Sequence, residues 1–125
     1  MNQVPKSFEA ACAITGDNQN VEFPDFLSKA TIAGHKLEII HKATNTIDGK
    51  LWEPDFSDYS QAKYTGWIEK LAHRSAVPSR SAFVYTYTCC SDSYTLLGAR
   101  FWFPDRATAR KFTEQHIDLI NELHA

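Results

Sequence analysis

Hydrophobic and polar positions near the start of the chain follow the pattern of a short helix. Ser7 is a suitable N-cap, the helix is expected to run through Ala13, and Gly16 supplies its end. Residues 1–6, which precede this helix, predict a loose lead-in that is ended by Pro5. The first regular element is therefore expected to begin only at Ser7.

A second helix is predicted by apolar residues that recur three and four positions apart. Asp25 or Ser28 can cap this helix, and it is expected to reach about Thr44. Residues 45–50 contain an Asp-Gly pair and predict its termination. The stripe that is expected to be buried consists of Ala33, Leu37, Ile40, Thr44 and Ile47.

The pattern changes to strand-like alternation in the second half of the chain. Residues 51–63 mix turn-forming and aromatic residues, and we expect them to form an ordered loop that packs onto the body of the protein. Residues 66–71, 81–90 and 95–103 have strand character, which is strongest in the second segment because β-branched and aromatic residues alternate there. A short turn separates the last two segments, which are expected to pair as an antiparallel hairpin.

Pro104 and Asp105 introduce a final helix that is expected to run to the end of the sequence. Its apolar stripe consists of Ala109, Phe112, Leu119, Ile120 and Leu123. The element order ααβββα predicts a single α+β domain over residues 1–125. We expect a small three-stranded antiparallel meander with three helices covering one face.

Length, charge and cysteine content narrow the class of protein. A domain of 125 residues buries enough surface to fold without a metal or a disulfide. The net charge of −2 and the absence of a basic stripe argue against a general duplex-binding protein. Three cysteines, Cys12, Cys89 and Cys90, give no disulfide framework and indicate a reducing compartment. No signal-like start or membrane-length apolar run is evident, so we expect a cytoplasmic protein.

No motif predicts catalysis. The histidines lack zinc-ligand spacing, and no nucleotide-binding fingerprint or nucleophile elbow occurs. Glu53, Asp55 and Asp58 lie beside aromatic residues, as glycosidase carboxylates do, but these residue types also stabilise turns. We expect Asp55 to bind backbone amides of its own loop, and we expect no enzyme activity, no metal and no cofactor.

Twelve of the sixteen aromatic residues fall between Trp52 and Phe103. Those in and beside the loop form either a minicore beneath it or an exposed patch that binds a protein partner. The candidate partner-binding residues are Trp52, Asp55, Phe56, Tyr59, Tyr64 and Trp67. The alternative is a sheet face with Tyr85, Tyr87 and Arg100 that binds single-stranded nucleic acid.

Five segments carry a recognisable pattern, in the order 7–12, 33–37, 52–58, 63–67 and 98–101. Together they resemble a family of short uncharacterised proteins of gut Bacteroidales bacteria and their phages and mobile elements. The most specific segment is a tryptophan-x-proline-aspartate-aromatic stretch followed by lysine-tyrosine and tryptophan. The chain departs from the pattern at Lys36, where the family has an aromatic residue, and at Gly66, where it has proline.

The resemblance covers most of the chain and implies a standalone domain from a phage or mobile element, without assigning catalytic residues. Together with the aromatic loop it predicts a non-enzymatic protein-interaction module, either a virion accessory component or an inhibitor of a host system. Its partner would be an unknown protein in the host cytosol or the virion.

Overall fold

The computed structural model describes residues 3–69, 82–88 and 101–123, and for 66–69 and 82–88 it describes the backbone. These residues form a mixed α+β structure, as predicted. The helices are α1 (Phe8–Thr15), α2 (Lys29–Thr44), α3 (Arg106–Gln115) and α4 (Ile117–Leu123). The strands are β1 (Thr46–Ile47), β2 (Lys50–Leu51), β3 (Tyr64–Glu69) and β4 (Ala82–Thr88).

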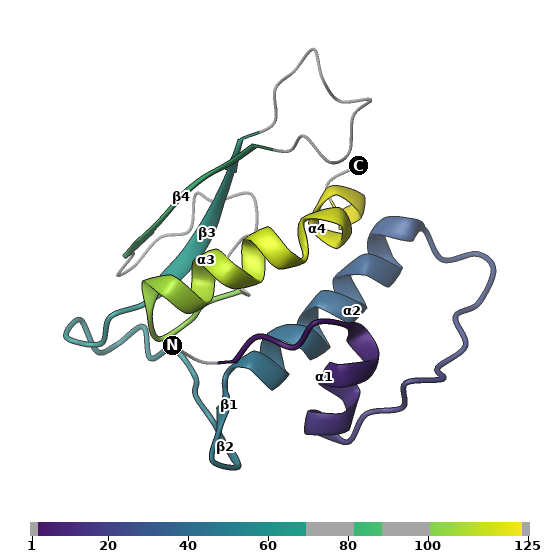
Figure 1. The fold of residues 1–125 in the computed structure, drawn as a ribbon, viewed down its shortest axis with the longest axis horizontal. Helices are drawn as coiled ribbons and strands as arrows, with labels where there is room; N and C mark the ends of the chain where they lie inside the picture. Colours follow the sequence, from purple (N-terminus) through teal and green to yellow (C-terminus); the bar gives the residue numbers. More distant parts are fainter. Residues whose placement is uncertain (1–2, 70–81, 89–100, 124–125) are drawn as a thin grey trace.

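The described helices lie on one side of the sheet formed by β3 and β4 (Figure 1). Helix α3 packs against both strands, while α2 packs against α1 and α4. The core between them includes Leu37 and Ile40 of α2 and Phe112 of α3, all fully buried. The predicted coverage of one sheet face by helices therefore holds for this part of the chain.

Strands β3 and β4 pair antiparallel, with Tyr64 opposite Thr88 and an irregularity between Trp67 and Ile68. They overlap the predicted strands 66–71 and 81–90. The predicted third strand, 95–103, lies outside the described residues except at its end. There Phe103 exchanges two backbone hydrogen bonds with Tyr64, at 2.9 and 2.8 Å. At this point Phe103 borders β3, whereas the sequence placed it beside the strand of residues 81–90.

Helix α1 begins at its predicted cap, Ser7, and runs to Thr15, two residues beyond the predicted Ala13 and up to the predicted stop at Gly16. The Ser7 hydroxyl accepts a hydrogen bond from the Ala10 amide at 3.1 Å, and Gly16 ends the helix at φ +84°. This positive φ suits glycine because it has no Cβ to clash with the backbone. The prediction of a loose lead-in is wrong for Val4 and Pro5, since both are buried against the helices.

Helix α2 is capped by Ser28, and its predicted buried stripe is confirmed up to Thr44. Ile47 was placed in this stripe but is 41% exposed, because the chain leaves the helix before it. The Asp-Gly pair does more than end a helix. Asp48 (φ 51°) and Gly49 (φ 78°) form the turn of a small hairpin between β1 and β2. A two-residue turn of this kind requires positive φ angles at both positions, which aspartate and glycine tolerate.

The final helix is interrupted, so the described residues contain four helices where three were predicted. Asp105 caps α3 by accepting the Thr108 amide at 2.8 Å, as predicted. At His116 the backbone leaves helical geometry (φ −111°, ψ 28°), and α4 starts at the next residue. At the break, Nε2 of His116 is 2.8 Å from the carbonyl oxygen of Pro5, which lies 111 residues earlier in the sequence.

Candidate functional site

The aromatic loop (residues 52–63) contains two consecutive turns with the same sequence pattern, aspartate-aromatic-serine. The Asp58 amide donates to the Asp55 carbonyl at 3.1 Å, and the Gln61 amide donates to the Asp58 carbonyl at 3.3 Å. The middle position of each turn is aromatic: Phe56 in the first and Tyr59 in the second. The chain therefore carries two aromatic side chains, three residues apart, on two consecutive backbone turns.

Each aspartate fixes its own turn through the serine two residues later. The Asp55 carboxylate accepts the amide and the hydroxyl of Ser57, at 3.0 and 2.5 Å. Asp58 binds Ser60 in the same way, at 2.9 and 2.6 Å. These serine hydrogen bonds, to the hydroxyl first and then to the amide, lower the pKa of both carboxyl groups. The prediction that Asp55 binds a backbone amide of its own loop is confirmed.

The side chain of Gln61 closes the first turn against the beginning of the loop. Its Oε1 atom accepts the Asp55 amide at 2.6 Å, and its Nε2 atom donates to the Glu53 carbonyl at 3.2 Å. One amide group thus satisfies a backbone donor and a backbone acceptor six and eight residues earlier. The two ends of the turn are held together without a helix or sheet.

Lys63 holds the second turn from inside the protein. Its side chain is completely buried, and its Nζ atom donates to the carbonyls of Asp58 and Gln61, both at 2.9 Å. The same ammonium lies 5.8 Å from the centre of the Phe56 ring, within the range of a cation–π interaction. A buried charge is stabilised by such charge-assisted hydrogen bonds. Sequence reasoning missed this residue, since nothing in the sequence distinguishes it from an exposed lysine.

Two contacts attach the loop to the body of the protein. The Phe56 ring meets the buried Trp102 ring edge-on, with centroids 5.7 Å apart and planes at 74°. The Trp52 amide donates to the carbonyl of Asn45 at 2.8 Å. The loop is therefore ordered and packs on the body, as predicted.

Trp102 is itself held by α2 and the residue that follows it. The Trp102 carbonyl lies 2.8 Å from Nε2 of His41 and 2.7 Å from Nδ2 of Asn45. Because a carbonyl only accepts, Nε2 of His41 carries a proton and cannot also accept from Asn45, although the two nitrogens are 3.0 Å apart. Burial lowers the pKa of His41, which favours this neutral form.

The structure separates the candidate partner-binding residues into exposed and packed groups. Asp55 and Phe56 are exposed with Tyr59, whose side chain is 74% accessible. Trp52 is half-buried, and Tyr64 packs against the hydrophobic core with the Arg106 guanidinium 5.8 Å from its ring. The Trp67 side chain lies outside the description. Neither the minicore nor the exposed patch describes all the aromatic residues in and beside the loop, because some of them pack and others face solvent.

The side chains of the nucleic-acid alternative, Tyr85, Tyr87 and Arg100, lie outside the part of the chain that the structure describes. Tyr85 and Tyr87 lie in β4, where only the backbone is described, and Arg100 falls outside the described residues. Cys12 is buried as predicted, and burial raises the pKa of its thiol. In the described part of the chain, no three side chains of His, Cys, Asp or Glu are grouped to hold a metal ion.

Comparison with protein-family models, with curated proteins and with solved structures found no match for this chain. Among residues 3–69, 82–88 and 101–123, no helix has the length and apolar character needed to cross a membrane. The aromatic loop is therefore the feature of the molecule from which a function is inferred.

Proposed function

We propose that the chain is a non-enzymatic protein-interaction module that binds its partner through the aromatic loop. The observation that supports this most directly is Tyr59, which is 74% exposed on a loop whose backbone is fixed by Gln61 and Lys63. Tyrosine is enriched at binding hot spots because it buries a large area and adds a polar hydroxyl. A fixed loop also loses little conformational entropy when a partner binds.

Within this proposal the two turn aromatics have different roles. Phe56 is 40% exposed and contacts Trp102 and the Lys63 ammonium, so it anchors the loop and offers the partner one edge. Tyr59 has no ring contact among the described residues and is available to enter a pocket on the partner. Exposed Asp55 lies at the rim, where the chain's own Ser57 already occupies part of its carboxylate.

The resemblance to phage and mobile-element proteins supplies the biological context of the proposal. The partner would be a protein of the virion or of a host defence or regulatory system, met in the host cytosol. Two turns closed by their own side chains support a recognition role, since they fix the loop shape before a partner arrives.

The test is capture of a partner from lysate of the native host, followed by binding measurements on that partner. Tyr59→Ala should weaken binding about thirtyfold, the effect of a hot-spot residue that contributes about 2 kcal/mol. Phe26→Ala is the matched control, because Phe26 is 85% exposed in a different loop. Both variants should unfold at the wild-type urea concentration. Wild-type affinity in Tyr59→Ala would remove the loop from the interface.

A further inference from the structure

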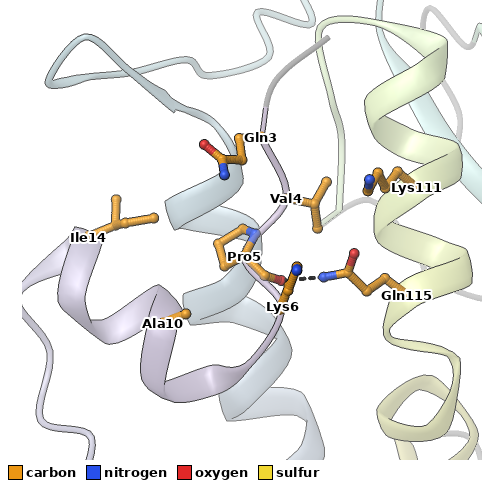
Figure 2. A pocket seen from close by; sticks show the side chains of 8 residues that line it. All are labelled: Gln3, Val4, Pro5, Lys6, Ala10, Ile14, Lys111 and Gln115. Carbon is orange, nitrogen blue, oxygen red and sulfur yellow. Dashed lines mark hydrogen bonds between the residues drawn. The ribbon is translucent and has the colours of Figure 1, made fainter.

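A groove separate from the aromatic loop lies between α1 and α3, with the N-terminal segment as its floor (Figure 2). Its volume is about 500 Å³, within the range of small-molecule pockets. Ala10 and Ile14 form the α1 wall, and Lys111 and Gln115 form the α3 wall. Each pair is spaced four residues apart and therefore shares one face of its helix.

The floor of the groove is held in place by α3. The Pro5 carbonyl accepts a hydrogen bond from Nε2 of Gln115 at 2.7 Å, drawn as the dashed line in Figure 2, and lies 2.8 Å from Nε2 of His116. Val4 is only 4% exposed, and Pro5 is buried. The groove is therefore formed before any ligand enters, which reduces the entropy lost on binding.

The charged residues of the groove all have the same sign. Lys6 and Lys111 line it, and no aspartate or glutamate does. Neither ammonium forms an ion pair with another described residue. The ion pair that the described residues do contain joins Lys42 to Asp17, outside the groove. Glu114 lies one turn from Lys111 on α3 but does not line the groove. Two unpaired cations beside a concave surface favour an anionic ligand.

The opposite wall is apolar. Ile14 is 52% exposed although its helix packs on the core through the other face, and Ala10 continues the same strip toward the floor. Pro5 adds apolar surface between the strip and the lysines. The groove thus has a cationic side and an aliphatic side.

We propose that this groove binds a small amphipathic anion, a monocarboxylate with an unbranched aliphatic chain of about eight carbons. The carboxylate would pair with Lys6 and Lys111, and the chain would lie along Ile14, Ala10 and Pro5. This site is independent of the aromatic loop, so the ligand could be bound with or without the protein partner.

The test is a titration of the full chain followed by amide chemical shifts in NMR. Octanoate carries both the charge and the chain, while propionate carries mainly the charge and octan-1-ol mainly the chain. Octanoate should give saturable shifts at Ala10, Ile14 and Lys111, and each of the other two probes should bind at least tenfold more weakly. Equal binding of octanoate and octan-1-ol would overturn the proposal, as would octanoate shifts confined to other parts of the chain.

Variants separate the two sides of the groove. The double variant Lys6→Gln, Lys111→Gln should lose about tenfold in octanoate affinity, because each exposed ion pair contributes up to about 1 kcal/mol. Lys29→Gln, an exposed lysine at the start of α2, is the matched control and should bind octanoate as the wild type does. Unchanged affinity in the double variant, with its fold verified by the same spectra, would show that the lysines do not select the ligand.

Discussion

Replacing the buried Lys63 with methionine tests whether its ammonium organises the aromatic loop. Methionine keeps an unbranched stem of similar length but cannot donate to the carbonyls of Asp58 and Gln61. It also removes the cation next to Phe56. The second turn then has only its Asp58–Ser60 contacts and one backbone hydrogen bond to hold it.

The expected change in the free energy of unfolding for Lys63→Met follows from two opposing contributions. Hydrogen bonds that involve a charged group contribute about 1.5–3 kcal/mol each, so two give about 3–6 kcal/mol. Methionine avoids the desolvation of a buried ammonium, and the two carbonyls regain water in a surface loop. We therefore expect a net loss of about 2 kcal/mol in the free energy of unfolding. Lys63→Ala also removes three buried methylene groups, at about 0.8 kcal/mol each, and should lose about 4 kcal/mol.

Urea unfolding gives the global effect, and amide hydrogen exchange gives the local one. In Lys63→Met the amides of Ser60 and Gln61 should exchange faster by a larger factor than amides in α2, because the turn opens locally before the whole protein unfolds. Lys50→Met is a suitable control, since Lys50 is exposed in β2 and its replacement should change stability by less than about 0.5 kcal/mol. Lys63→Met with wild-type stability and wild-type exchange in the loop would refute the assigned role.

Two further predictions concern the core. Burial lowers the pKa of both His41 and His116. The unfolded chain therefore binds more protons than the folded one as the pH falls below about 6.5, and stability should decrease there by at most about 1.4 kcal/mol per pH unit for each imidazole. Urea unfolding at pH 7.5 and pH 5.5 measures this, and equal stability at the two values would contradict it. Phe112→Ala should cost about 3–5 kcal/mol, because this fully buried ring packs against the rings of Phe101 and Phe103 and of two histidines, and its removal leaves a cavity among them. Phe26→Ala, at an exposed position, should change the same unfolding free energy by less than about 0.5 kcal/mol.

Helix beginnings could be predicted because their causes lie within a few residues. Ser7, Ser28 and Asp105 each accept a backbone amide three residues later, and Gly16 supplies the positive φ that ends α1. The break at His116 could not be predicted in the same way. Its ring meets a carbonyl 111 residues away, and the sequence stripe of the last helix continues across the break without a change in period.

The candidate site was predictable only in part, for a similar reason. The repeated aspartate-aromatic-serine pattern is visible in the sequence, and it predicts turns in which an aspartate binds nearby amides. The burial of Lys63 depends on where Phe56 and the two turn carbonyls lie in space. Tyr64 was assigned to the same patch because it follows the loop closely, yet it is the first residue of β3 and packs against the core.

The internal closure of the loop and its attachment to the body use different residues, and this separation bears on how a partner would bind. Gln61 and Lys63 fix the turns, whereas Phe56 connects them to Trp102, whose carbonyl is held through His41 and Asn45. A partner that binds Tyr59 would therefore meet a preformed loop and would leave its internal hydrogen bonds intact. The affinity of the complex would then depend on the Tyr59 contact, while the orientation of the loop would depend on the packing of Phe56 against Trp102.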